Sequence, residues 1–413
     1  YIDAYNKVGG SSGGTYPDAK ADMLNYFENG QLIVNYIGHG SATGWTKEKI
    51  LTIQDIKKLY LDKLPFFITA TCDFSRFDAP TTSAGEEMFL NSKGGGVGLI
   101  STTRVVYMDK NETFNKELIS HMFSRDTDGH RYRIGDVIRM AKCSVTEHYG
   151  QDLNKLNFIL LGDPALKLAF PEHKIKITEI NGVDIDKASS NIVLKARSQA
   201  TFKGIILTPS GEKDETFNGY IQQRLYDSER SITTHGEDEG GEPYTFKVRD
   251  SKLYEGKDLV KNGEFEFTFK LPKELNYSNE PALINLYAYD EAQKIEAQGT
   301  SKDFIVNGYD NEVEADEIGP TIEYFYLNSS DYSYGATVNE TPVFIAQVYD
   351  KSGINVSGIG LGHDLTIKID DNPNTEYIIN NYFTPASGDF GRGTIMYQIP
   401  ELSEGEHTLT IKV

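Results

Sequence analysis

A histidine and a cysteine each follow an apolar, strand-like run near the start of the chain. Residues 32–37 lead into the Gly-His-Gly turn that contains His39, and residues 66–70 lead into the turn that contains Cys72. A thiolate is a good nucleophile, and a nearby imidazole promotes the thiolate form and can later protonate a leaving amine. These two residue types could therefore break or transfer a peptide bond.

The backbone around this pair suits the same chemistry. The glycines on both sides of His39 allow a substrate to approach the main chain closely. The N–H groups of Gly40 and Cys72 could together bind the oxyanion that forms during acyl transfer. The alternative is structural, with Cys72 as a small buried residue and His39 as a loop residue between turn glycines. Because both residues follow successive strands, we favour catalysis for the pair.

The segment between the two turns decides whether they meet. Apolar residues recur at helical spacing over residues 53–61, so residues 31–78 are predicted to form strand, helix and strand. A right-handed crossover lays the two strands parallel, with both carboxyl ends at one edge of the sheet. Open α/β sheets carry their sites at that edge. We therefore expect His39 and Cys72 to face one crevice.

The segments around both turns resemble the gingipain family of caspase-like cysteine peptidases. The resemblance rests on the stretches NYIGHGSATGW, ITATCDFSRFD, GGGVGLISTTR and LNFILLGDPALKL, and it covers about residues 1–170. Within the family it is strongest to the signal peptidases (sortases) of type IX secretion. The resemblance implies a caspase-like fold, His39 as general base and acid, Cys72 as nucleophile, and the Gly40 and Cys72 amides as the oxyanion hole.

Trp45, Asp73 and Asp78 lie close in sequence to the two motifs and could line a substrate pocket. Packing or turn formation would explain each of them equally well. Cys143 is expected to pack within a helix. The histidines at 121, 130 and 148 share no metal-ligand spacing, so we expect no metal ion and no cofactor.

The composition narrows the class of partner. Asp and Glu outnumber Lys and Arg by 61 to 41, the net charge is −20, and no basic run occurs. This balance argues against nucleic acid as a partner. The 413 residues include only two cysteines, which excludes a disulfide framework. No apolar run reaches the roughly 18 residues that a membrane-spanning helix needs, so we expect no transmembrane segment.

The pattern of the chain changes near residue 171. Before it, helical periodicity alternates with apolar strands; after it, short alternating runs are separated by Gly, Asn, Asp and Pro, which is typical of β-sandwiches. The predicted fold class is α/β plus all-β: a caspase-like α/β half-domain followed by two Ig-like β-sandwich domains. The predicted boundaries are 1–171 for the C-terminal part of a gingipain-like catalytic domain, 172–310 for the first β-sandwich, and 311–413 for the second, truncated at its end. Residues 211–242 are predicted to form a long polar loop, and we expect the chain to be an internal part of a longer protein.

The leading functional hypothesis follows from the resemblance. It is a cysteine peptidase or transpeptidase that removes the C-terminal secretion signal of type IX-exported proteins. Its partners would be polypeptide substrates that carry this signal, with secretion-machinery proteins as further candidates. The protein would be exported, either to the outer-membrane-associated cell surface or into the medium. The alternatives are a general gingipain-like secreted endopeptidase and a non-catalytic surface scaffold or adhesion protein.

Overall fold

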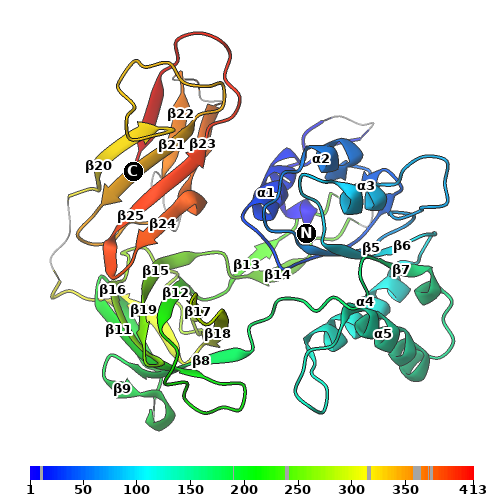
Figure 1. The fold of residues 1–413 in the computed structure, drawn as a ribbon, viewed down its shortest axis with the longest axis horizontal. Helices are drawn as coiled ribbons and strands as arrows, with labels where there is room; N and C mark the ends of the chain where they lie inside the picture. Colours follow the sequence, from blue (N-terminus) through cyan, green and yellow to red (C-terminus); the bar gives the residue numbers. More distant parts are fainter. Residues whose placement is uncertain are drawn as a thin grey trace. The chain divides into compact units, whose positions relative to one another are not determined.

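The computed structural model describes residues 1–9, 13–188, 190–237, 241–313, 318–356, 364–370, 372 and 375–413. Tyr1–Phe170 together with Thr233–Thr245 form one compact unit, and Pro171–Ile232 with Phe246–Val413 form a second (Figure 1). The chain therefore returns once to the first unit after it has entered the second.

A four-stranded sheet forms the centre of the first unit. Its order is β1 (Ile33–Ile37), β5 (Phe66–Ala70), β6 (Gly98–Thr102) and β7 (Phe158–Leu161). β1 and β6 run parallel to β5, and β7 runs antiparallel to β6. The expected parallel pairing of the two strands that precede His39 and Cys72 is confirmed. β5 and β6 are buried along their whole length, because helices cover both faces of the sheet.

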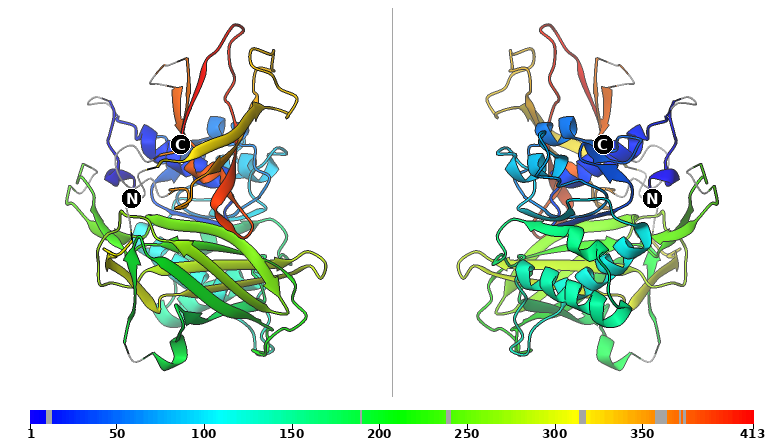
Figure 2. Two further views of the ribbon diagram at one scale, coloured as in Figure 1. Left: turned by 90° about the vertical axis from the view of Figure 1, so that its left-hand side faces the viewer. Right: turned by 90° about the vertical axis from the view of Figure 1, so that its right-hand side faces the viewer.

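The helices of the first unit form a layer on each face of the sheet. They are α1 (Pro17–Glu28), α2 (Ile53–Lys58), α3 (Ala84–Leu90), α4 (Met108–Phe123) and α5 (Ile134–Tyr149). The helix predicted over residues 53–61 corresponds to α2. α1, α2 and α3 pack on the face that presents Phe67 and Leu99, whereas α4 and α5 pack on the face that presents Phe66 and Ile68 (Figure 1). The right-hand view of Figure 2 shows α4 and α5 side by side.

Two helices of this unit begin with a capping box. In α2 the Thr52 hydroxyl accepts the N–H of Asp55, whose carboxylate accepts the N–H of Thr52. Ser83 and Glu86 form the same pair at the start of α3, as the sequence predicts. Each box satisfies two backbone donors that the first helical turn leaves unpaired. The crossover helix and the helix after the Cys72 turn therefore have well-defined first residues.

A small three-stranded sheet follows β1 directly. It consists of β2 (Gly40–Ser41), β3 (Gly44–Trp45) and β4 (Leu51–Thr52), in that order. Gly40 pairs with Trp45, which pairs in turn with Leu51. This ladder fixes the main chain on the carboxyl side of His39.

The second unit begins with an eight-stranded sheet in the order β11, β16, β15, β12, β17, β18, β8, β9. β11 also pairs with β8, so seven of these strands close on themselves around one hydrophobic core. The bounds are β8 (His173–Ile180), β9 (Val183–Asp184), β11 (Gln199–Leu207), β12 (Gly219–Tyr226), β15 (Lys252–Lys261), β16 (Glu264–Lys270), β17 (Leu283–Asp290) and β18 (Ile295–Ser301). Two separate pairs are β10 (Ile192–Ala196) with β19 (Phe304–Tyr309), and β13 (Arg230–Thr233) with β14 (Thr245–Val248).

This closed sheet differs from the two-sheet sandwich predicted for residues 172–310. The difference arises at Gly204 in β11, where the pairing with β8 contains a β-bulge. A Cβ atom on Gly204 would collide with the carbonyl oxygen of Lys176 on one side and the ring of Phe265 on the other. The glycine thus lets β8 and β16 approach β11 together, which closes the sheet.

The last part of the second unit contains two sheets, as a β-sandwich does. One has the order β20 (Thr321–Leu327), β21 (Val343–Tyr349), β25 (Asp389–Gln398), β24 (Phe383–Ala386), and the other β23 (Glu376–Ile378), β22 (Thr366–Ile369), β26 (Leu409–Lys412). Phe344 and Ile395 of the first sheet share a core with Ile367 of the second. Short 3-10 helices are η1 (Ile2–Ala4), η2 (Asn154–Asn157), η3 (Ile185–Lys187) and η5 (Asn380–Tyr382).

The prediction of a long loop over residues 211–242 is wrong at β12 and at β13, and residues 238–240 lie outside the described part of the chain. β12 lies inside the closed sheet between β15 and β17. The polar residues of β12 obscured an alternating pattern in which Ile221, Gln223 and Leu225 face inward and are buried. Among the described residues, no helix is long and apolar enough to cross a membrane.

Candidate active site

The strands that lead to His39 and Cys72 end side by side. The last residues of β1 and β5, Ile37 and Ala70, are register partners. The next residue after β1, Gly38, donates its N–H to the Ala70 carbonyl at 3.4 Å. Both turns therefore leave the same edge of the sheet from neighbouring positions.

Strand alternation directs the Cys72 turn toward the face of the sheet that α4 and α5 cover. Ile33 of β1 and Ala70 of β5 belong to the core under α4 and α5, and Asn35 of β1 exchanges hydrogen bonds with Asn115 of α4. Side chains along a strand alternate, so the odd-numbered positions of β1 and the even-numbered positions of β5 share this face. Cys72 continues the β5 series and packs against that same core.

Gly40 and Thr71 bring the two turns into contact. A Cβ atom on Gly40 would collide with Thr71 Oγ1 and would lie 2.9 Å from the Gly44 carbonyl oxygen. Thr71 is fully buried, and its hydroxyl has no hydrogen-bond partner within the described part of the chain. The residue after His39 thus lies against the residue before Cys72, and only a glycine fits there.

The backbone of His39 is held on one side by an aromatic stack. Its carbonyl accepts the Tyr36 hydroxyl at 2.6 Å and the Thr46 N–H at 2.9 Å. The Tyr36 ring stacks on Trp45 with centroids 4.3 Å apart, and burial raises the pKa of Tyr36, so its hydroxyl stays protonated and can donate. The imidazole itself is exposed, and no side-chain hydrogen bond of His39 occurs among the described residues.

The Cys72 turn is held by the segment that follows β6. The Cys72 thiol is half-buried and donates to the Val106 carbonyl at 3.5 Å. Asp73 adopts a left-handed backbone conformation with φ of 55°, and its N–H donates to the Arg104 carbonyl at 3.2 Å. The Thr102 hydroxyl donates to the Thr71 carbonyl. Within the described residues, no hydrogen bond involves the backbone N–H of Cys72.

The three expected pocket residues lie in different surroundings. Trp45 is 2% exposed and packs against Phe67 and Phe74, so it belongs to the core and is not placed to line a pocket. Asp78 is exposed and forms a two-point ion pair with Arg104 at 2.6 and 3.1 Å, which lowers the Asp78 pKa. Asp73 is half-buried beside Cys72.

Cys143, His121 and His148 belong to α4 and α5 and not to these two turns. Cys143 is exposed on α5, so the expectation that it packs in the core is wrong; the buried face of α5 is instead formed by residues such as Ala141 and Val145. His148 bonds to Glu117 at 2.9 Å and His121 to Ser144 at 2.8 Å. The described residues contain no group of three His, Cys, Asp or Glu side chains that could hold a metal ion.

Several residues that shape the site have no signal of their own in the sequence. Asn111 of α4 donates to the Ala70 carbonyl at 3.4 Å, and Arg104 and Val106 hold the Cys72 turn through their carbonyl groups. Backbone contacts depend on the path of the chain and not on residue type. Thr71 could have been found, because it lies between a buried strand and the cysteine.

The chain was compared with protein families, curated proteins and solved structures. Residues 1–169 match peptidase family C25, and no curated protein matches the chain. A crystal structure of dimeric latent PorU from Porphyromonas gingivalis is 36% identical over 77% of this chain and 30% of that chain, with a TM-score of 0.39. The complex of Porphyromonas gingivalis RgpB pro- and mature domains is 19% identical over 70% of this chain and 57% of that chain, with a TM-score of 0.34.

The chain thus spans less than a third of the length of the PorU chain that it resembles. The match to the peptidase family ends at residue 169, one residue before the boundary of the first compact unit at Phe170. The similarity to peptidase family C25, the gingipain family, thus covers the first compact unit up to residue 169.

Proposed function

We propose that the chain is part of a cysteine peptidase or transpeptidase in which Cys72 is the nucleophile and His39 the general base and acid. One observation carries the proposal: β1 and β5 end as parallel neighbours, and Gly40 of the His39 turn contacts Thr71 of the Cys72 turn. This contact supports the pairing of a nucleophile and a base from segments that are distant in the sequence.

The proposed reaction proceeds through a thioester. His39 accepts the proton of Cys72, and the thiolate attacks the carbonyl carbon of the scissile peptide bond. The Gly40 and Cys72 N–H groups stabilise the negative charge on the carbonyl oxygen. His39 then protonates the leaving amine, and the C–N bond breaks. Water or a second amine attacks the thioester and releases Cys72 as a thiol.

The proposed chemistry requires Cys72 to change its hydrogen bond. Its thiol now donates to the Val106 carbonyl, and the residue is half-buried, so part of it is accessible. Active-site hydrogen bonds are often long or misdirected before substrate binds, and they shorten in the complex. Substrate binding would therefore accompany a rotation of the Cys72 side chain from Val106 toward His39.

We further propose the C-terminal secretion signal of type IX-exported proteins as the substrate, and the outer-membrane-associated cell surface as the location. The sequence resemblance around both catalytic turns to the signal peptidases of that pathway supports this assignment. Secretion-machinery proteins would be the partners that deliver the substrate. A general endopeptidase would use the same two residues and differ only in its choice of peptide.

The test uses the full-length protein and an exported protein that carries its C-terminal signal. Wild type should release the signal, and addition of a primary amine should give an amide product that intact-mass measurement distinguishes from the hydrolysed acid. Cys72→Ala and His39→Ala should each lower turnover by about 10³-fold or more. Cys143→Ala and His130→Ala, which replace an exposed cysteine and an exposed histidine, are the matched controls and should keep full turnover.

The alternatives correspond to distinct outcomes of this experiment. Equal cleavage of unrelated peptides would identify a general endopeptidase. Full turnover by the Cys72→Ala variant would overturn the assigned roles. If the folded wild-type protein cleaves neither kind of peptide, the result would support a non-catalytic scaffold.

A further inference from the structure

The closed sheet of the second unit has a gap in its wall between β15 and β16. These two strands pair only next to their turn, through Val260 with Phe265 and Lys261 with Glu264, and then separate. The turn between β24 and β25 lies across the gap: Gly388 donates its N–H to the Lys257 carbonyl at 2.8 Å, and Ser387 forms a parallel bridge with Lys257. These backbone contacts therefore hold the turn between β24 and β25 over the gap.

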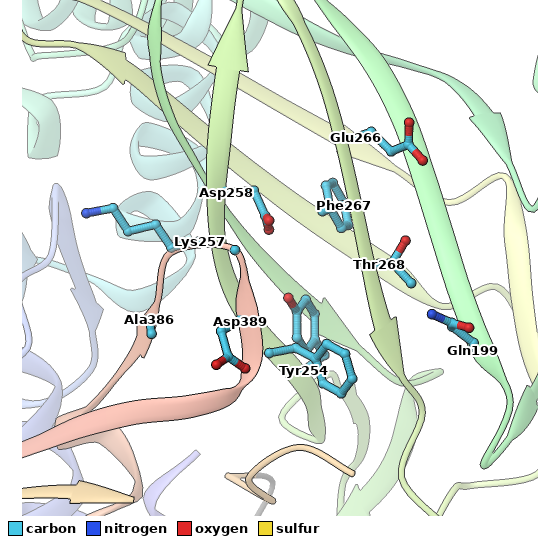
Figure 3. A pocket seen from close by; sticks show the side chains of 11 residues that line it. Gln199, Tyr254, Lys257, Asp258, Glu266, Phe267, Thr268, Ala386 and Asp389 are labelled. Carbon is cyan, nitrogen blue, oxygen red and sulfur yellow. The ribbon is translucent and has the colours of Figure 1, made fainter. Parts of the chain in front are cut away.

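A cavity of about 410 Å³ lies between the separated strands and this turn. Figure 3 shows the side chains that surround it. The aromatic side chains that line it are Tyr254, Phe267 and Phe390, and the carboxylates are Asp258, Glu266 and Asp389. The cavity thus combines apolar rings with hydrogen-bond acceptors, which is usual for a ligand site.

Among the carboxylates of the cavity, Asp258 is the one that no cation of the described residues pairs with. It lies on the inward side of β15, and Gln223 Nε2 donates to its Oδ2 at 3.0 Å. Burial raises the pKa of Asp258, the Gln223 hydrogen bond opposes this only in part, and no cation pairs with the carboxylate within the described residues. A buried carboxylate with a neutral partner favours the approach of a cation.

The cation nearest in sequence, Lys257, points away from Asp258. Figure 3 shows the two side chains on opposite sides of β15. The Lys257 Nζ lies over the rings of Tyr220 and Tyr289, 4.3 and 5.7 Å from their centroids. Lysine at 257 therefore leaves the charge of Asp258 uncompensated.

The other two carboxylates of the cavity already have cationic neighbours. Asp389 bonds to Arg392 at 2.8 Å, and Glu266 lies 3.8 Å from the Lys203 ammonium group. They add to the negative potential of the cavity. Asp258 remains the group that an incoming cation would pair with directly.

The side-chain oxygen of Gln223 is a second acceptor near the cavity that lacks a hydrogen-bond donor. Its side chain is 0% exposed, and its Oε1 has no hydrogen-bond partner within the described part of the chain. A Cβ atom on Gly256 would lie 2.6 Å from this oxygen and would collide with the Tyr254 hydroxyl, so the oxygen lies over Gly256 beside the Tyr254 wall of the cavity. An unpaired buried acceptor is costly, and this one lies behind the wall of the cavity, because Gln223 is not among the lining residues.

We propose that this cavity binds an organic cation with several N–H donors, a guanidinium or a primary ammonium group. Asp258 forms the ion pair, the lining carboxylates of Glu266 and Asp389 accept further N–H groups, and the Tyr254 and Phe267 rings lie against the apolar stem. Guanidinium suits the site best because it offers five N–H donors in one plane and packs well on aromatic rings. This proposal does not depend on the peptidase assignment.

The test is calorimetric titration of the full chain with agmatine. Wild type should bind agmatine, and Asp258→Asn, which keeps the size of the side chain, should weaken binding by at least about tenfold. Glu296→Gln is the matched control, since Glu296 lies on the same closed sheet and bonds to the Tyr287 hydroxyl outside the cavity. It should leave the affinity unchanged.

Two further ligands test whether the bound cation belongs to a peptide or to a free amine, and whether its positive charge is needed for binding. N-acetyl-arginine methylamide represents an arginine side chain of a polypeptide: binding at least as tight as that of agmatine assigns the site to a peptide, and weaker binding to a free amine. The citrulline analogue, which is neutral and of the same shape, should not bind. Chemical-shift mapping on wild type should show changes at Tyr254 and Asp258. Failure of both cations to bind, equal affinity of Asp258→Asn, or equal affinity for the citrulline analogue would overturn the proposal.

Discussion

The accessibility of the two thiols and their chemical activation lead to opposite expectations. Cys143 is exposed on α5, whereas Cys72 is half-buried and donates to the Val106 carbonyl. If accessibility alone set the rate, iodoacetamide would label Cys143 first. A neighbouring imidazole that promotes the thiolate form would reverse this order.

We therefore expect Cys72 to alkylate about tenfold faster than Cys143 near neutral pH, the effect of a moderate gain in thiolate fraction. In His39→Ala the order should revert to the one that exposure dictates. Peptide mass spectrometry over time measures both rates in one sample. Faster labelling of Cys143 in the wild type would contradict activation of Cys72.

Gly40 provides a second test at the residue scale. In Gly40→Ala the new methyl group would collide with Thr71 Oγ1 and approach the Gly44 carbonyl oxygen to 2.9 Å. Thr71 is fully buried, so the His39 turn must move away from the Cys72 turn, at a cost of about 1–3 kcal/mol in the free energy of unfolding. Peptide cleavage should fall much more than this loss of stability explains.

Gly319→Ala is the control for this substitution. A Cβ atom at Gly319 would meet nothing within 4 Å, so both stability and cleavage should stay at the wild-type level. Chemical denaturation measures the first and the signal-release assay the second. Full cleavage by Gly40→Ala would show that the contact between the turns is not needed.

At the scale of elements, periodicity was a sufficient guide for the first unit. β1, α2 and β5 were predicted because their apolar residues form short continuous runs or recur at helical spacing. Periodicity failed at β12, where Gln223 occupies an inward position, and it could not reveal that Gly204 closes the sheet. Closure depends on contacts between β8, β11 and β16, which lie far apart in the sequence.

The candidate site, like the fold, could be predicted from the sequence only in part. The strand ends, and with them the proximity of the two turns, could be predicted from the order of apolar segments. The contact of Gly40 with Thr71 and the support from Val106 could not, because they depend on the path of the main chain after the strands end. Trp45 packs inward, which is one of the two roles that the sequence left open for it.

Asn91 tests how strongly one side chain joins two elements. Its Nδ2 lies 2.9 to 3.1 Å from the carbonyl oxygens of Ile56, Leu59 and Gly94, which connects the end of α2 to the turn after α3. Asn91→Ala leaves these carbonyls without that donor and should lower the free energy of unfolding by about 3 kcal/mol. Asn29→Ala removes one bond of this kind, at 2.9 Å to the Asn25 carbonyl, and should cost only about 1 kcal/mol. Denaturant unfolding of both variants gives the comparison, and equal losses would contradict it.

At the scale of the whole molecule, the chain enters its second unit at Pro171, returns to the first at Thr233 and leaves again after Thr245. Asp3 is the anchor of the returning segment. Its carboxylate accepts the N–H groups of Gly236 at 2.7 Å and Glu237 at 3.2 Å, and its main-chain carbonyl accepts the N–H of His235 at 2.9 Å. The side chain is buried, and these backbone N–H groups, together with the Tyr16 hydroxyl at 3.4 Å from Oδ1, satisfy its oxygen atoms.

Asp3→Asn in the full chain tests this anchor. The amide keeps the size of the carboxylate but loses its charge and one acceptor, so the bonds to Gly236 and Glu237 should weaken by about 1–2 kcal/mol, which corresponds to an increase of about tenfold in local amide exchange. The His235 N–H, bonded to the main chain of residue 3, should change less and serves as an internal reference. Asp22→Asn removes an exposed bond to the Tyr5 hydroxyl and should leave exchange at residues 235–237 unaltered. Hydrogen–deuterium exchange at these amides measures the effect. If Asp3→Asn leaves their protection unchanged, the returning segment is held by the pairing of β13 with β14 and not by the buried carboxylate.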